Sequence, residues 1–273
     1  MSVNTKSQQR ENKLITWVKN YSYSIVTIII LVVIWEFAVK FFDVKEYLLP
    51  APSIIYKNIV KNFSLLLEYS KVTAWEILLG YLMSIVIGIP MGLMIFYSRF
   101  LERIIYPLLV ASQTIPKIAL APLLIIWLGW GIWPKIIVSF LIAFFPIVVD
   151  TVVGLKNTEP EMIYLVRSMG ANRVQIFFKI SLPNALPNIF GALKVASTLA
   201  VVGAVVGEFV ASDSGLGYLL VVSQGYLDTA SMFAGIVFLS LLGIIFFFII
   251  EIIERLAIPW KVEKESILHT ATM

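Results

Sequence analysis

A run of polar residues inside an apolar stretch is the part of this sequence best suited to chemistry. The run Ser112-Gln113-Thr114-Ile115-Pro116-Lys117 carries hydroxyl, amide and ammonium groups, which bind polar solutes through hydrogen bonds and charge. It begins roughly ten residues into an apolar segment, at a depth of about 15 Å for a helix that rises 1.5 Å per residue. A lysine at such a depth in a membrane is costly and tends to face the protein interior or an aqueous path. The predicted lining of a translocation pathway is therefore Ser112, Gln113, Thr114 and Lys117.

The same run has a second interpretation, as a kinked helix packed against its neighbours. In that case an acid such as Asp150 or Glu76 would neutralise Lys117. Broken helices are tolerated within a membrane only where they are buried in protein or face a water-filled cavity. The prolines that interrupt this segment are Pro107, Pro116 and Pro122. They fit both interpretations, which stay open at this point.

Glu208 is the other acidic candidate inside an apolar segment. It follows the small residues Gly203, Ala204 and Gly207, which permit close approach between membrane helices. We place it near the outer mouth of the protein. It serves there either in the pathway or gate, or as a structural hydrogen-bond acceptor for the turn over residues 212–217.

The composition argues against catalysis, metal binding and nucleic-acid binding. The chain has no cysteine, and its single histidine, His269, lies in a polar tail. No carboxylates are clustered, so we predict no catalytic residue, no metal site and no cofactor. A formal net charge of +4 is too small and too dispersed to indicate nucleic acid as a partner. Hydrophobic residues make up 59% of the chain and charged residues 14%, whereas a soluble domain carries roughly 25% charged residues.

Six segments are long and apolar enough to cross a bilayer, which takes about 20 residues per helix. The fold class predicted is an all-α membrane protein with six transmembrane helices. The first segment lacks a small-residue cleavage site and is interpreted as a retained span rather than a signal peptide. The six predicted spans are residues 23–39, 72–97, 104–128, 135–155, 186–211 and 231–257.

The distribution of lysine and arginine predicts that both ends are cytoplasmic. Most of the basic residues fall in the segments that would then lie inside, as positively charged cytoplasmic loops require. The organisation predicted is a cytoplasmic tail over 1–22, a permease domain over 23–260 with its core at about 68–257, and a cytoplasmic tail over 261–273. The long outer loop, 40–71, contains a turn at 48–53. Ser53 is expected to cap an amphipathic helix there that lies at the outer surface.

The cytoplasmic loop over residues 156–185 is polar, basic and rich in helix signals. A helix over 161–169 is expected to stop at Gly170, because glycine favours leaving a helix. Asn172 is expected to cap a second helix over 173–180. Pro183, with Pro187, would then mark the entry to the fifth span. A long loop with its own secondary structure indicates a docking site for a partner outside the bilayer.

Here the chain resembles the permease subunits of bacterial ABC importers, of the binding-protein-dependent type I family. The spacing from Gly170 through nine residues to Ile180-x-Leu182-Pro183 is similar to that of the family's cytoplasmic EAA loop, which docks into a groove on the ATPase. The three residues that give this loop its name are here Tyr164-Leu165-Val166, a departure found in the nitrate, sulfonate and taurine branch. Further stretches that resemble this branch are residues 48–53, 89–92, 116–123, 127–129, 207–209 and 214–218.

The resemblance implies a fold, partners and site residues. The fold is that of a type I importer permease with a cytoplasmic coupling-helix loop, in the bacterial cell membrane. The partners are a cytoplasmic ABC ATPase dimer, an extracytoplasmic substrate-binding protein, a second copy of the chain as a homodimer, and the lipid bilayer. The implied ATPase-coupling residues are Tyr164, Arg167, Ser168, Gly170, Ala171, Asn172, Arg173 and Pro183. The chain contains no G-x-x-x-x-G-K-[ST] loop, so any ATP hydrolysis belongs to a separate subunit.

These features bear on three candidate functions. The first is a permease subunit of an ATP-driven importer for a small solute. The resemblance implies a nitrate-, sulfonate- or taurine-like anion, or a vitamin-related heterocycle such as a thiamine pyrimidine precursor or riboflavin. The alternative is an ion-coupled secondary transporter, which is expected to show inverted repeats and broken helices in matching halves. A membrane-embedded enzyme is the third, and it lacks candidate catalytic groups.

Overall fold

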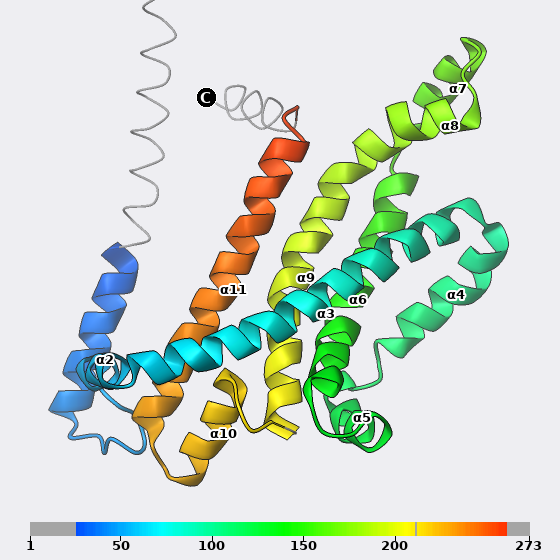
Figure 1. Cartoon of the computed structure of the whole chain (residues 1–273). Helices are drawn as coiled ribbons and strands as arrows, with labels where there is room; N and C mark the ends of the chain where they lie inside the picture. Colours follow the sequence, from blue (N-terminus) through cyan, green and yellow to red (C-terminus); the bar gives the residue numbers. More distant parts are fainter. Residues whose placement is uncertain (1–25, 211, 261–273) are drawn as a thin grey trace, which may run out of the picture. The chain divides into compact units, whose positions relative to one another are not determined.

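The computed structural model describes residues 26–210 and 212–260, which form helices and connecting turns without a strand among them (Figure 1). The predicted tails 1–22 and 261–273, and the first residues of the predicted first span, lie outside the described residues. The chain divides into two compact units. One comprises Met1–Phe63 with Ser223–Ala234, and the other comprises Ser64–Val222 with Gly235–Met273.

Long apolar helices make up most of the second unit. Within the described residues, four helices are long and apolar enough to cross a membrane, and they match the predicted spans 72–97, 135–155, 186–211 and 231–257. Their bounds are α3 (Phe63–Tyr97), α6 (Ile132–Lys156), α9 (Leu182–Val210) and α11 (Thr229–Ala257). The last of them begins with residues of the first unit. The shorter apolar helix α10 (Leu216–Gly225) lies between α9 and α11 in the chain.

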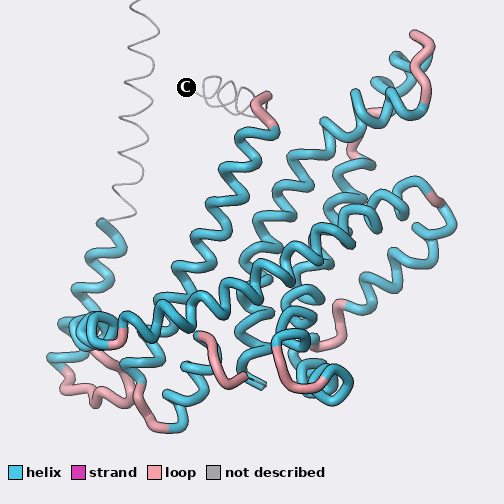
Figure 2. Tube along the Cα trace, viewed as in Figure 1, coloured by secondary structure: helices cyan, strands magenta, loops and turns pink. Residues whose placement is uncertain are grey.

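The predicted third span, 104–128, is a broken pair of helices rather than a single one, in agreement with its interrupting prolines. The chain forms α4 (Arg99–Ser112), a break, a short 3₁₀ helix η1 (Lys117–Leu120) and α5 (Ala121–Leu128). The two arms are bent by 86°, and the loop between them is visible in Figure 2. Pro116 causes the break, because proline removes a backbone donor and disfavours helical geometry in the residue before it.

Helix contacts show how the long helices run relative to one another. Close contacts pair α3 positions 80, 88 and 92 with α6 positions 139, 147 and 151 in the same order, so α3 and α6 are parallel. Against α9, the order is reversed: α6 positions 154, 139 and 135 meet α9 positions 188, 203 and 207. The segment from α4 to α5 therefore connects opposite ends of the bundle, and this broken pair carries the chain across once.

Small residues allow these helices to approach closely. A Cβ atom at Gly80 would lie 2.6 Å from the Cβ of Ser139, and one at Gly92 would lie 2.7 Å from the Cβ of Thr151. On α9, a Cβ at Gly203 would overlap the Ser139 backbone. Such positions are typical of membrane helix interfaces, where packing rather than the hydrophobic effect holds helices together.

The first unit contains a helix over residues 26–41 and the short helix α2 (Pro52–Lys61). The amphipathic helix predicted in the outer loop is thus confirmed, but the role given to Ser53 as its cap is wrong. The N-cap is Ala51, and Ser53 instead donates from its backbone N–H (2.9 Å) and its hydroxyl (2.8 Å) to the Glu36 carboxylate. The first amides of a helix have no acceptor within the helix. Pro52, at the first position of α2, has no N–H, so the Ser53 N–H is the first that needs an acceptor, and Glu36 supplies it.

Candidate functional site

The loop between α6 and α9 has the predicted two-helix form. Helix α7 (Pro160–Ser168) is followed by Gly170 at φ 88°, a left-handed conformation that glycine adopts without strain. The Gly170 N–H donates to the Arg167 carbonyl at 3.0 Å, which closes the end of the helix. Asn172 then caps α8 (Arg173–Ile176) in a reciprocal capping box, with both bonds to Gln175 at 2.9 Å.

The second coupling helix differs from the one expected over 173–180. Helix α8 passes into a π-helical turn, η2 (Phe177–Ser181), which continues directly into α9. Pro183 lies in the first turn of α9, so it marks the entry to this helix as expected. In a π turn each N–H donates to the carbonyl five residues back instead of four, as the Leu182 N–H does to the Phe177 carbonyl. This arrangement accommodates Pro183, which has no N–H to donate.

This loop presents a mixed apolar and basic surface. Its exposed large apolar side chains are Met162, Tyr164, Leu165, Met169, Val174 and Phe178. Arg167, Ser168 and Arg173 are exposed beside them, Gly170 and Asn172 are exposed at the turn, and Ala171 and Pro183 are half-buried. Loops that carry large apolar groups on their surface mark interaction sites. We call the exposed surface over residues 160–178 the coupling surface.

The predicted pathway residues gather at the break between α4 and η1. A cavity of about 260 Å³ lies there, and two of the four residues, Ser112 and Lys117, line it together with the rings of Phe144 and Phe145. Gln113 and Thr114 do not line it. The structure thus brings two of the four residues to one cavity. The hydroxyls of Ser112 and Thr114 each bond a backbone carbonyl three residues back, at 2.7 Å.

The alternative that Glu76 neutralises Lys117 is wrong. Glu76 is fully buried and pairs with Lys135, whose Nζ lies 2.6 Å from Glu76 Oε1. Among the described residues no ion pair joins Lys117 to Asp150 or to any other acid. Lys117 is half-buried at the start of η1, beside the cavity.

Glu208 has the structural partners expected of its second interpretation. Its carboxylate accepts a hydrogen bond from the Thr73 hydroxyl at 2.6 Å and another from the Gly217 N–H. Glu208 is 1% exposed and lies away from the cavity at Lys117. With Glu76 and Lys135 it forms a group that we call the buried charge cluster.

Comparisons with known proteins decide the family. Residues 84–258 match the family described as binding-protein-dependent transport system inner membrane component. The chain belongs to this family. It is the transmembrane permease subunit of an ABC importer, a membrane protein, and the alternatives of an ion-coupled transporter and a membrane-embedded enzyme fall away.

Two curated relatives indicate the branch of the family. The formylaminopyrimidine transport permease protein ThiX of Halalkalibacterium halodurans is 42% identical over 85% of this chain and 93% of its own length. The riboflavin transport system permease protein RibX of Chloroflexus aurantiacus is 35% identical over 86% of this chain and 89% of its own.

Two further comparisons extend to a more distant permease and to a solved structure. The taurine permease TauC of Escherichia coli is 25% identical over 90% of this chain and 92% of its own. A chain of the MetNI methionine ABC transporter, solved in inward-facing conformations, has a TM-score of 0.62 at 24% identity. The match covers 71% of this chain and 97% of that one, and supports the type I permease fold.

The permease also holds buried ion pairs that the sequence reasoning missed. Lys135 was expected at the very edge of the fourth span, but it lies inside the first turn of α6 and is 5% exposed. The signal was Pro134, since proline favours the first turn of a helix and places the helix start before Lys135. Lys194 of α9 pairs with Glu254 of α11 at 2.6 Å and lies 5.9 Å from the centre of the Phe247 ring.

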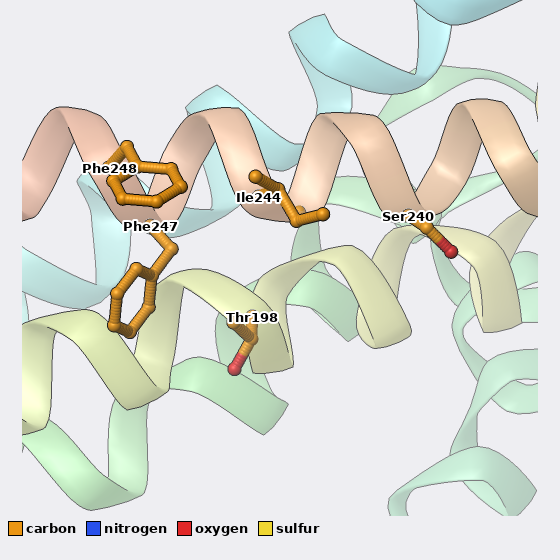
Figure 3. Close-up of a pocket in the computed structure, with 6 residues that line it drawn as sticks. Thr198, Ser240, Ile244, Phe247 and Phe248 are labelled. Carbon is orange, nitrogen blue, oxygen red and sulfur yellow. The ribbon is translucent and has the colours of Figure 1, made fainter. Parts of the chain in front are cut away.

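Helices α9 and α11 of the permease frame an apolar groove of about 270 Å³ (Figure 3). Thr198 and Ser240 give it the only hydroxyls among its described lining residues, and both bond carbonyls of their own helices. Ile244, Phe247 and Phe248 line the α11 side. The groove therefore offers apolar surface rather than hydrogen-bonding groups.

Proposed function

We propose that two copies of this permease form the membrane pathway of an importer driven by a separate ABC ATPase. Both ends of the chain lie in the cytoplasm, the ATPase binds the coupling surface, and an extracytoplasmic binding protein delivers the solute. The coupling residues are Tyr164, Arg167, Ser168, Gly170, Ala171, Asn172, Arg173 and Pro183. The absence of a phosphate-binding loop in the sequence supports a separate ATPase.

The observation that carries the proposal is the coupling surface and its link to α9. Tyr164, Met169 and Phe178 are 66%, 77% and 61% exposed, on a loop otherwise fixed by a capping box and a closed helix end. From Arg173 to Val210 the chain is one continuous helical segment of 38 residues. A push on α8 is therefore transmitted along α9, because a helix resists bending far more than a loop does.

The substrate we propose is a small heteroaromatic compound of the formylaminopyrimidine class. The relative that transports such a compound is 42% identical, and that for riboflavin is 35% identical. The cavity at Lys117 suits a ring of this kind, because Phe144 and Phe145 offer aromatic faces and Lys117 offers a donor. Uptake of a labelled aminopyrimidine, in competition with taurine and nitrate, tests the substrate class.

The coupling role is tested by Gly170→Pro and by deletion of residues 167–173. Proline cannot adopt φ 88°, so the turn between α7 and α8 is lost. Both variants are expected to insert into the membrane normally, to lose uptake by at least tenfold, and to release the ATPase during co-purification. Normal uptake in either variant refutes the coupling role.

Gly129→Pro is the matched control. Gly129 also has a positive φ, 78°, with nothing within 4 Å of where a Cβ would lie, but it sits in the turn after α5. The control variant should retain ATPase co-purification. If both proline variants release the ATPase equally, the effect reflects general misfolding rather than the coupling surface.

A further inference from the structure

The buried charge cluster joins three long helices of the second unit. Glu76 of α3 is 0% exposed, Lys135 of α6 is 5% exposed and Glu208 of α9 is 1% exposed. Lys135 lies 2.6 Å from Glu76. Glu208 adjoins this pair, because its neighbour Gly207 packs against Lys135 and because it accepts a hydrogen bond from Thr73, which precedes Glu76 by about one helical turn. Lys135 and Glu208 lie within one turn of the ends of their helices, so the cluster occupies one end of the bundle.

The buried charge cluster also binds the turn over residues 212–217 and the start of α10. Lys135 donates to the Ser212 hydroxyl at 2.9 Å, and Glu208 accepts from the Gly217 N–H. The Thr73 hydroxyl, which donates to Glu208, accepts from the Leu216 N–H at 2.9 Å. The first two backbone N–H groups of α10, those of Leu216 and Gly217, therefore donate to Thr73 and Glu208, which together cap that helix.

The 212–217 turn is shaped to this site. A Cβ at Gly217 would lie 2.7 Å from Glu208 Oε2, and Gly215, at φ 107°, leaves no room for a Cβ beside the same carboxylate. All contacts of the turn with the cluster are side-chain or cap bonds. The helices α3, α6 and α9 are also packed together by contacts outside the turn, which join Gly80 and Gly203 to Ser139 and Gly207 to Lys135, so the turn is able to detach without unfolding a long helix.

Ions suit a contact that opens and closes. Two apolar groups that separate into water lose favourable free energy, whereas separated ions regain their hydration. Within a membrane protein, buried ionisable groups are costly and mark functional positions. Glu76 in particular makes no hydrogen bond that meets normal geometry, and its charge is balanced by the nearby Lys135 Nζ alone among the described residues.

We propose that Glu76, Lys135 and Glu208 are positioning residues of the outer gate. They hold the 212–217 turn and the start of α10 against α3, α6 and α9 while the outer side is closed, and they release both when it opens. This role rests on the proposed function, which places this end of the bundle outside the cell.

Site-specific labelling tests the release directly, because the chain has no native cysteine. Leu216→Cys places a thiol at a position that is 0% exposed and directly under the cap, without changing a member of the cluster. In the complete transporter, reconstituted with its ATPase and binding protein, this thiol should resist a membrane-impermeant maleimide at rest. Trapping the ATPase with vanadate should raise the labelling rate at least tenfold.

Two cysteine controls define the range. Asp213→Cys, on the exposed part of the turn, should react in both states, and Ala196→Cys, 0% exposed in α9, in neither. Equal protection of Leu216→Cys in both states, in a transporter that still takes up solute, overturns the proposal and leaves the cluster as a fixed brace.

The double variant Glu76→Leu/Lys135→Met separates the gate from a brace in a second way. A brace is satisfied by apolar groups of similar volume, so uptake would persist. A gate would no longer close fully, because the turn loses the bond from Lys135 to Ser212. The expected result is normal insertion, uptake reduced at least tenfold, and labelling of Leu216→Cys in both states; wild-type uptake contradicts the proposal.

The side from which Asp213→Cys reacts separates this inference from the proposed function. Labelling from the cytoplasmic side alone would show that the orientation is wrong. State-dependent labelling of Leu216→Cys from that side would still show an opening contact, at the inner end.

Discussion

At the scale of single residues, burial decides what each charge contributes. Lys135 and Lys156 both belong to α6 and both pair with glutamate, at 2.6 and 2.5 Å. The Lys135 pair is almost fully buried, while the side chains of Lys156 and Glu102 are 45% and 35% exposed. Removal of one partner from a buried pair leaves the other charge uncompensated in a site without water. At an exposed pair, water solvates the remaining charge.

Lys135→Ala and Lys156→Ala are therefore expected to differ in stability. Loss of Lys135 should cost about 3–5 kcal/mol, whereas loss of Lys156 should cost at most about 1 kcal/mol. Thermal unfolding of the detergent-solubilised permease measures both, with Lys156→Ala as the matched control on the same helix. Similar shifts in the two melting temperatures would show that Lys135 is not paired as described.

At the scale of elements, the coupling surface depends on short helices that tertiary packing hardly supports. Helix α8 has only four residues, and isolated helices of that length do not persist in water. Its capping box and its continuation into η2 and α9 hold it in place. The cap thus orders Arg173 and Val174 before any partner arrives, which lowers the entropy cost of docking.

Asn172→Ala removes the cap and should weaken ATPase binding. A lost N-cap costs about 1 kcal/mol, which corresponds to roughly a fivefold weaker association. Asn172→Ser keeps a side-chain acceptor and serves as the control, with near-normal affinity expected. Titration of the ATPase against the reconstituted permease measures both. Identical affinities for the two variants would show that α8 does not need its cap to bind.

The same elements show how far the sequence alone leads. The long spans, Gly170 and the Asn172 cap were predictable, because apolar length and capping residues act locally. The π turn before Pro183 was missed, and the interruption at Pro116 was expected without its 86° bend, since a proline signals a disturbance without specifying its geometry. The Glu76–Lys135 pair was missed because it joins helices far apart in the sequence, and only close packing of α3 and α6 brings the two together.

At the scale of the whole molecule, helix directions constrain the topology of the second unit. Since α3 and α6 are parallel, the chain between them has to cross from one end of the bundle to the other. Helix α4, with 14 residues, spans only about 21 Å, less than the hydrocarbon core of about 30 Å. The non-helical residues 113–116 complete the crossing, and irregular backbone at that depth requires protein or water around it.

Single cysteines in the turn after α5 and in the coupling surface test this topology. Trp130→Cys and Ser168→Cys both replace exposed residues, at opposite ends of α6. Trp130→Cys should react with an impermeant maleimide only from outside intact cells, and Ser168→Cys only after the membrane is opened. Reaction of both from the same side would mean that α6 does not cross the membrane. Reversed sides, with Trp130→Cys reacting only from the cytoplasm and Ser168→Cys only from outside, would mean that the pair α4–α5 re-enters without crossing. The parallel packing of α3 against α6 would then be wrong, because a chain that returns to its starting side delivers the next long helix in the opposite direction.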